Sequence, residues 1–417
     1  CIQKGEKLNI KTNSRSWRLL MLFVVFAMVV VACGNTSDDT ADDVVEESSD
    51  TTEPAAEPEA PATTVASSSA PDGVFKLAIF QDPATQNLFK WYDTDTDAYS
   101  LYQMTGQSVS LFGISYPNYT LIPSMATELV ETSTDNGDGT FSYSVPIVEG
   151  YEWSDGNPIT ANDWVFTYNT AKGLPLLGQW AAVWPSNCEV ECVTNVEAPD
   201  DYTVKISFNY DPGLTGWQYG AAVAPALSQA YWEQFATSRE DLLAVSGADA
   251  PVASAFVYEK IEQGAFYTWT YDPDTMYFGG ETTNYANGGV AISQDNGVAP
   301  AVSGEFGDLS GESFTYANGP FVGQVEFSIY NDQDSAYLAF ENGDVDFVLN
   351  PSGVKRATYE KLSRIPGTEV ISNFSNGMRY MAFNTRVFPG SNKAYRQAVG
   401  CIAVSYTHLT LPTSDLV

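Results

Sequence analysis

The stretch Tyr151-Glu-Trp-Ser-Asp-Gly-Asn-Pro-Ile-Thr-Ala-Asn-Asp-Trp-Val-Phe-Thr167 predicts a strand, a tight turn and a capped helix in succession. Asp155-Gly156 supplies the turn, because glycine tolerates the positive φ that such a corner requires. Thr160 stands where an N-cap residue belongs, and Asp163 three residues later provides the acidic half of a capping box. The helix is expected to run to Gly173 as its C′ residue. These residue types indicate a structural role rather than catalysis.

The same stretch resembles a family signature, W-S-D-G-x-P-[LIV]-T-A-x-D-x-V-F-[ST]. That signature marks the family 5 extracytoplasmic solute-binding proteins, the peptide- and nickel-binding receptors of ABC importers. A second match is Asn342-Gly-Asp-Val-Asp-Phe347, which resembles the family step [SN]-G-[ED]-[VI]-D, and further matches extend the resemblance over residues 73–403. The positions that carry the signature are Trp153, Asp155, Gly156, Pro158, Thr160 and Asp163.

The resemblance implies a fold of the α/β class, the two-lobed type II periplasmic-binding-protein fold with three domains. Residues 73–113 and 193–351 would form a discontinuous domain I, and residues 114–192 would form domain II. Residues 352–403 would be only the start of domain III, so that the second lobe would be incomplete. Groups that recognise peptide termini tend to lie in domain III of this family, and the sequence therefore nominates no ligand-contacting residue.

The function that the resemblance implies is that of a receptor, not of an enzyme. It would capture oligopeptides as an added strand and deliver them to an ABC permease and its ATPase, as a monomer without a cofactor. Receptors for nickel chelates or oligosaccharides are alternatives within the family. A surface sensor or adhesin that keeps the fold is an alternative outside it.

Several local patterns predict individual elements of the folded part. Because β-branched and aromatic residues favour strands, strands are expected at 74–80, 140–148 and 325–330, and a helix at 334–341. Residues 284–319 are rich in Gly, Asn and Ser, which indicates an insertion or a long surface loop.

The first 32 residues resemble a lipoprotein signal peptide. A basic start leads into the apolar run Leu19–Ala32, whose 14 residues are too few for a membrane-spanning helix. Val30-Val31-Ala32-Cys33 resembles a lipobox, which implies cleavage before Cys33 and a lipid on its sulfur. An uncleaved membrane anchor is the alternative, and in both cases the rest of the chain lies outside the cell membrane.

Acidic residues dominate the remainder of the chain. Five of the 19 basic residues but one of the 52 acidic residues precede Cys33, so that the part from Cys33 onward carries a net charge of −37. This charge argues against nucleic acid as a partner and against a basic patch for anionic lipid. Residues 33–72 are low in complexity and are expected to form a disordered, extended linker.

Cys188 and Cys192 are the one close cysteine pair, and in an exported protein they predict a small disulfide loop. Zinc would require further Cys or His ligands, and redox catalysis usually uses the closer C-x-x-C spacing. Asp93-Thr-Asp-Thr-Asp97 resembles the start of a calcium loop, but Ala98 and Met104 stand where an EF-hand needs Gly and Glu. A solvated acidic turn is the expected structure there, and no metal site is predicted.

The sequence carries no common enzyme motif such as G-x-S-x-G, H-E-x-x-H or a Walker A loop. Six tryptophans would either line a pocket or fill cores, and packing is the expected role: Trp91, Trp153, Trp164, Trp180, Trp184 and Trp217.

The last residues, Val404–Val417, depart from the family pattern. Val404-Ser-Tyr-Thr-His-Leu-Thr-Leu-Pro-Thr413 resembles a translated sequencing adapter and contains the single histidine, His408. We expect this tail to be non-native and to pack against nothing.

Overall fold

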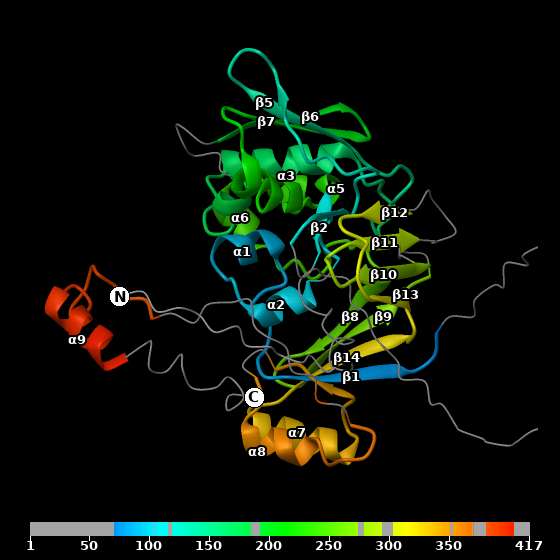
Figure 1. The fold of residues 1–417 in the computed structure, drawn as a ribbon, viewed down its shortest axis with the longest axis vertical. Coiled ribbons are helices and arrows are strands. Elements are labelled where there is room, and N and C mark those ends of the chain that lie inside the picture. The colour runs from blue at the N-terminus through cyan, green and yellow to red at the C-terminus, as the bar shows by residue number, and fades with distance from the viewer. Residues whose placement is uncertain are drawn as a thin grey trace, which may run out of the picture.

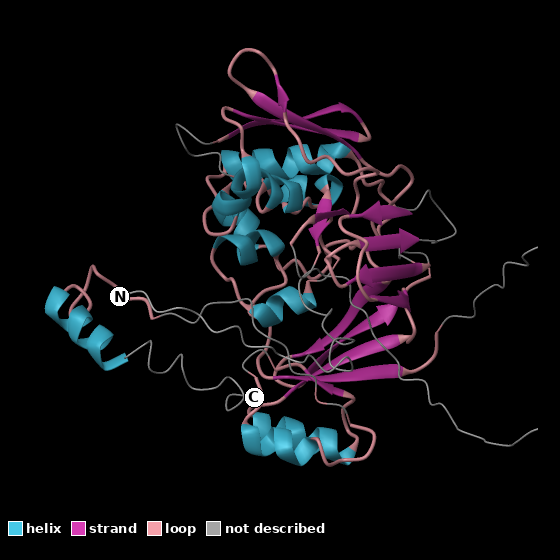
Figure 2. Ribbon diagram, in the orientation of Figure 1, coloured by secondary structure: helices cyan, strands magenta, loops and turns pink. Residues whose placement is uncertain are grey.

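The computed structural model describes residues 71–104, 106–115, 119–184, 192–273, 279–293, 303–350, 353–368, 370 and 381–403. The predicted signal peptide, Cys33, nearly all of the linker, Cys188 and the tail from residue 404 lie outside these ranges. The described part is a mixed α/β structure in which helices and sheets form separate layers (Figures 1 and 2). None of its helices has both the length and the apolar character needed to cross a membrane.

The central sheet has the strand order β15-β1-β14-β9-β8. Strand β1 runs parallel to its two neighbours β14 and β15, whereas β9 and β8 are antiparallel additions. Tyr267 and Phe327 stack across β9 and β14 with ring centroids 4.5 Å apart, in the core of this sheet. The strands are β1 (Val74–Ile79), β8 (Phe256–Glu262), β9 (Phe266–Tyr271), β14 (Gln324–Ile329) and β15 (Phe347–Val348).

A second sheet, of order β4-β5-β7-β6, packs on the long helix α3 (Ala161–Gly173). Val204, Ile206 and Phe208 alternate along β7 and are fully buried, which is the period-two pattern of a sheet with one core face. The strands are β4 (Thr134–Asp135), β5 (Phe141–Pro146), β6 (Val193–Asp200) and β7 (Thr203–Phe208). Strand β5 pairs with β7 across the domain limit predicted at residue 192. The domain plan stays a prediction.

The segment from residue 284 to 319 is not a long surface loop, so that this interpretation is wrong, whereas its alternative, an insertion, stays a prediction. It holds most of a four-stranded antiparallel sheet of order β12-β11-β10-β13. Glycines with positive φ at its tight corners, such as Gly288 (φ 88°) and Gly311 (φ 92°), let strands that carry Thr and aromatic residues pair. The strands are β10 (Glu281–Tyr285), β11 (Val290–Ser293), β12 (Ser303–Phe306) and β13 (Ser313–Ala317).

The predicted helix at 334–341 is confirmed as α7 (Gln333–Asn342), which Asp332 caps and Gly343 ends in the left-handed region. The other α-helices are α1 (Leu88–Asp93), α2 (Ala98–Gln103), α4 (Trp180–Val183), α5 (Gln229–Trp232), α6 (Arg239–Ala244), α8 (Arg356–Leu362) and α9 (Lys393–Ala403). Shorter elements are β2 (Phe112–Ile114), β3 (Leu121–Pro123), a π-helical turn at Leu214–Gln218, and 3-10 turns at Ala221–Val223 and Glu233–Phe235.

The signature segment forms the predicted turn and helix, with two differences. Gly156 has φ 80° at the turn, and Thr160 is the N-cap of α3. Before the turn there is one isolated bridge, Glu152 to Pro158, rather than a strand, because the chain bends back on itself at once. Gly173 is the last helical residue and Leu174 the C-cap, so that Gly173 lies inside the helix and not at the expected C′ position beyond its end.

Candidate ligand site

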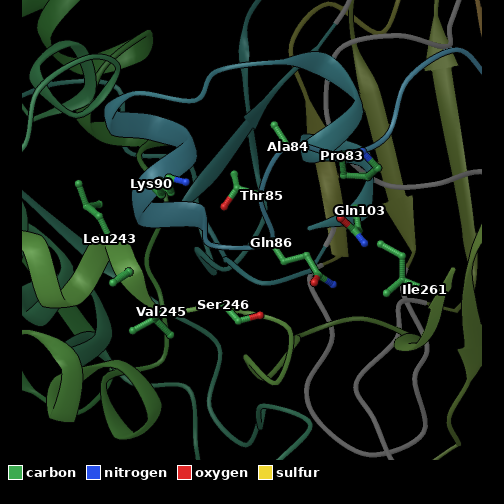
Figure 3. Close-up of a pocket in the computed structure, with 11 residues that line it drawn as sticks. Pro83, Ala84, Thr85, Gln86, Lys90, Gln103, Leu243, Val245, Ser246 and Ile261 are labelled. Carbon is green, nitrogen blue, oxygen red and sulfur yellow. The ribbon is translucent and has the colours of Figure 1, made fainter. Parts of the chain in front are cut away.

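A cavity of about 360 Å³ lies beside the C-terminal end of β1. Its volume lies within the ~300–1,000 Å³ typical of small-molecule sites, and ligands of open α/β sheets commonly bind outside the carboxyl ends of parallel strands. The loop after β1 forms one wall, and α6 with the residues after it forms the opposite wall (Figure 3). The lining residues are Pro83, Ala84, Thr85, Gln86, Lys90, Gln103, Leu243, Ala244, Val245, Ser246 and Ile261.

Two buried polar side chains fix the walls of the cavity. The Ser100 hydroxyl accepts the backbone N–H groups of Ala84 at 2.7 Å and Thr85 at 3.2 Å, and so holds the loop against α2. Asn87 caps α1, and its side-chain amide donates to the carbonyl oxygens of Leu242 at 2.8 Å and Val245 at 3.0 Å. Asn87 thereby joins the two opposite walls directly.

A close backbone approach adds to this rigidity. Gly247 has φ 75°, and a Cβ atom there would lie 2.2 Å from the carbonyl oxygen of Gln86. Only glycine fits this contact, because both the conformation and the space exclude a side chain. The side-chain amide of Gln107 donates to the carbonyl oxygen of Gly247 at 3.0 Å from the other side.

The cavity wall carries no uncompensated charge among its described residues. Lys90 is the one ionisable residue in the lining, and its Nζ lies 2.9 Å from Oδ2 of Asp95. The hydrogen bond from Lys90 holds the pKa of Asp95 below its ordinary value. A neutral polar ligand therefore suits the lining better than an ion, whose desolvation nothing here would offset.

Polar groups converge on one side of the cavity. Figure 3 shows Gln86 and Gln103 beside Ile261. Burial raises the pKa of the Tyr258 hydroxyl, while side-chain hydrogen bonds with Gln86 and Gln103 lower it. The hydroxyl of Tyr258 and both amide atoms of Gln103 are buried, so that these polar atoms are not exposed in the cavity.

The signature residues lie elsewhere, around a buried carboxylate. Asp163 is 4% exposed, and its two oxygens accept the backbone N–H groups of Thr160 at 3.0 Å and Gln229 at 2.8 Å. The indole N–H of Trp153 donates to Asp163 at 3.4 Å. Burial raises the pKa of Asp163 to about 6, against the hydrogen bonds that lower it. The signature thus connects a turn, a helix start and a distant segment, and none of its residues lines the cavity.

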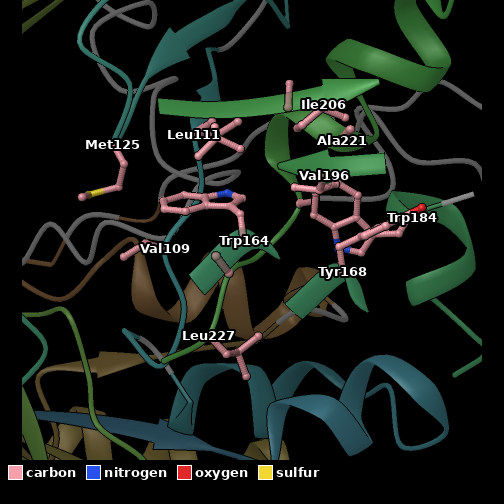
Figure 4. Packing of buried hydrophobic residues seen from close by; sticks show 14 of the residues in the cluster. Val109, Leu111, Met125, Trp164, Tyr168, Trp184, Val196, Ile206, Ala221 and Leu227 are labelled. Carbon is pink, nitrogen blue, oxygen red and sulfur yellow. The ribbon is translucent and has the colours of Figure 1, made fainter. Parts of the chain in front are cut away.

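The six tryptophans singled out in the sequence are all buried, which confirms the core interpretation. Figure 4 shows Trp164, Tyr168 and Trp184 among aliphatic side chains beneath the second sheet. Trp184 meets Tyr168 edge to face, with ring centroids 5.6 Å apart. These rings provide packing rather than a ligand surface.

The acidic segment Asp93–Asp97 uses its carboxylates within the fold. Asp93, whose side chain is fully buried, pairs with Arg239 and accepts the backbone N–H of Leu177 at 2.6 Å. Asp97 caps α2 by accepting the backbone N–H of Ser100 at 2.8 Å. These partners replace the solvated turn expected from the sequence.

Only one cysteine of the predicted disulfide, Cys192, lies within the described residues. Cys192 is buried and disulfide-bonded. Position 188 lies outside the described residues, as does the predicted lipid attachment residue Cys33. The pairing of Cys188 with Cys192 and the modification of Cys33 stay predictions.

A family model of the bacterial extracellular solute-binding proteins, family 5 (middle region), matches residues 120–402. This chain belongs to that family. The resemblance read from the signature is thereby confirmed, together with the α/β class and the type II binding-protein fold that the family carries. No curated protein matches the chain.

Several solved structures are similar to this chain at low identity. The ABC transporter substrate-binding protein CtaP from Listeria monocytogenes shares 20% identity, with a TM-score of 0.44 over 70% of this chain and 47% of its own. The oligopeptide-binding protein AppA from Bacillus subtilis, in complex with a nonapeptide, shares 16% identity with a TM-score of 0.43, over 71% and 46%. NikZ from Campylobacter jejuni, in complex with Ni(L-His), shares 14% identity with a TM-score of 0.45, over 70% and 45%. The present chain spans about half the length of each.

Proposed function

We propose that this protein is the substrate-binding receptor of an ABC importer, and that it captures oligopeptides outside the membrane for a permease and its ATPase. The observation that carries the proposal is the family match over residues 120–402. The family signature supports the same function. Its residues stabilise the fold around Asp163, and none of them lines the cavity, which stays available for a ligand.

The cavity lining favours a neutral hydrogen-bonding ligand, such as a peptide main chain, over a charged chelate. Its charged residue is neutralised, and its remaining polar groups are amides and hydroxyls. Amide and hydroxyl groups both donate and accept, as the recognition of peptide main chains requires. A nickel chelate or an oligosaccharide is the competing outcome, and ligand trials separate the three.

Attachment to the outer face of the cell membrane through Cys33 is part of the proposal, with the acidic linker as a spacer. Like charges and prolines extend such a linker, and so would hold a monomeric receptor away from the lipid surface.

Thermal-shift measurements with a peptide pool, nickel–histidine and oligosaccharide mixtures test the function. We expect the peptide pool to raise the unfolding temperature in a concentration-dependent manner, because a ligand that binds only the folded state stabilises it. If the peptide pool gives no shift, the peptide assignment fails. A shift with nickel–histidine or sugar alone would transfer the assignment to that ligand.

A further inference from the structure

Strand β13 differs from the other edge strands of the described sheets, because it is regular and uncharged and longer than three residues. Proteins commonly protect sheet edges by short strands, charges or bulges. Strands β4 and β15 have two residues each, and β2 and β3 have three. Strand β12 contains Glu305, while β6 and β8 contain charged residues and shifts in register. Strand β13 reads Ser-Phe-Thr-Tyr-Ala and has none of these protections.

The main-chain groups of Ser313, Thr315 and Ala317 point away from the sheet. Next to the strand, Asn318 donates its backbone N–H to the carbonyl oxygen of Gly280 at 2.7 Å, on the side of β10. Hydrogen-bonded pairs alternate along an antiparallel ladder, so that even-numbered residues of β13 bond to β10 and odd-numbered ones face outward. The outward residues are exposed, and no described strand pairs with this edge. Their N–H and C=O groups are accessible to a further strand.

The sequence of β13 is complementary to itself in the antiparallel direction. A two-fold axis at Thr315 places this residue opposite its own copy, and Phe314 opposite Tyr316 of the second chain. Threonine pairs and aromatic pairs both stabilise antiparallel strands. Glu312, the acidic residue that precedes the strand, then lies opposite the neutral Asn318. The register therefore brings no like charges face to face, and a second copy of this chain fits the edge.

The side chains that meet across this axis are aromatic and accessible. Phe314 is 46% exposed. Phe314 and Tyr316 lie on one face of β13, with ring centroids 5.9 Å apart. In the pair of strands they occupy non-hydrogen-bonded positions, where opposite side chains approach most closely. Burial of these rings from both copies supplies apolar contact in addition to the main-chain hydrogen bonds.

We propose that β13 pairs with β13 of a second copy, so that two molecules share one continuous antiparallel sheet. The pairing forms about six main-chain hydrogen bonds, because each outward residue contributes one donor and one acceptor. So short a contact buries less than the ~1,200 Å² of a stable interface, and the net charge of −33 opposes it. The pair is therefore weak. The monomer predominates in dilute solution, and the pair forms where the protein is concentrated, as attachment to a membrane would concentrate it.

Sedimentation equilibrium of the purified chain at concentrations from about 1 to 500 µM measures the pairing. We expect a monomer–dimer equilibrium with a dissociation constant on the order of 100 µM, because interfaces of this size bind weakly. A chain that stays monomeric over the whole range overturns the proposal.

A charge at the centre of β13 tests where the two copies meet. Thr315→Lys places two like charges opposite each other at the axis, and should weaken the pairing at least about tenfold. Thr283→Lys is the matched control, because Thr283 lies opposite Thr315 on the inner strand β10 and shares a 2.8 Å hydroxyl hydrogen bond with it. Both variants lose this bond, but the control leaves the edge of β13 unchanged and should pair as the wild type does. Equal weakening by both variants overturns the proposal.

Thr315→Pro separates loss of pairing from loss of folding. Because the N–H of Thr315 points outward, proline removes a donor of the proposed interface and no hydrogen bond of the internal ladder. We expect a urea midpoint close to that of the wild type, together with pairing that is at least about tenfold weaker. Pairing at wild-type strength contradicts the proposal. A large fall in the urea midpoint also contradicts it, because it would mean that this N–H bonds within the sheet.

Discussion

Asp163 accepts the backbone N–H of Gln229 at 2.8 Å, although the two residues lie 66 positions apart. Its other oxygen accepts the N-cap N–H of Thr160, so that one carboxylate joins the start of α3 to the start of α5. The indole of Trp153 contacts the same carboxylate. This relationship explains in physical terms why the signature combines a Trp, a Thr and an Asp at fixed spacing.

Replacement of Asp163 by Asn should destabilise the fold. Asn has one acceptor oxygen, so that its NH₂ group would face a backbone N–H, and a buried donor would lose its partner. We expect a loss of about 2 kcal/mol in the free energy of unfolding at pH 7, measured by urea denaturation. Asp155→Asn is the control, because Asp155 makes an exposed turn contact with the N–H of Asn157 at 3.1 Å. Equal losses for both variants would show that the connection is unimportant.

The same residue should make stability depend on pH. Its folded pKa of about 6 lies above the ordinary value of 3.8, so the folded state binds a proton more tightly than the unfolded state. The contribution of Asp163 is therefore greatest below pH 3.8 and declines as the pH rises to about 6. The expected decline is about 3 kcal/mol.

This decline is measured as the difference in unfolding free energy between the wild type and Asp163→Asn at several pH values from 4 to 7. The difference should shrink as the pH rises. A constant difference would mean that the three N–H donors around Asp163 offset its burial completely.

Arg239 should matter more than its half-exposed position suggests. Its guanidinium pairs with Asp93, whose side chain is fully buried. Among the described residues, Arg239→Met would leave that charge with the N–H of Leu177 alone. We expect a loss of about 3 kcal/mol in the free energy of unfolding, since removal of one partner leaves a buried charge uncompensated. Lys355→Met tests an exposed pair, 3.8 Å from Asp334, and should change stability by less than ~0.5 kcal/mol. Similar effects of the two variants would refute the distinction.

Gly247→Ala should disturb the cavity, because its Cβ would lie 2.2 Å from the carbonyl oxygen of Gln86. Gly343→Ala provides a matched control, with φ 77° and no atom near the added Cβ. We expect the control to lose about 1 kcal/mol through backbone strain alone, and Gly247→Ala to lose at least twice as much. Urea denaturation of both variants measures these losses. Equal losses in the free energy of unfolding would show that the loop of Gln86 moves aside at no cost.

The proposed attachment to the membrane depends on a lipid bound to Cys33. Cys33→Ser should release the protein from the membrane fraction into the soluble fraction, and should abolish incorporation of labelled fatty acid, because the thioether bond requires the sulfur. Fractionation and metabolic labelling of the expressing cells measure both. Retention of the Cys33→Ser variant in the membrane would favour an uncleaved anchor.

Local features of the fold could be read from the sequence, whereas contacts between distant segments could not. The turn at Gly156 and the cap at Thr160 depend on neighbours within a few residues, and both were predictable. The bond from Gln229 to Asp163 depends on tertiary packing and was not. The sheet formed by β10–β13 was missed because its Gly-rich turns dominate the composition of that segment, although its strands carry the usual β-branched and aromatic residues.

The candidate ligand site could not be predicted from the sequence, for a related reason. Gln103 lies in a helix of six residues, too short to show a helical period, and a glutamine gives no sign of burial in a sequence. The loop after β1 lies close to α6 through Asn87 and Gly247, which are separated by more than 150 residues. Only the fold brings these walls together.

The most direct test of the receptor function is to identify what the protein carries. The chain is purified without denaturation after exposure to a peptide-rich medium, and the released ligand is analysed by mass spectrometry. The account predicts peptides, at up to about one per protein chain, that dissociate on denaturation. Protein that retains no peptide, or that releases a nickel chelate or an oligosaccharide instead, would contradict it.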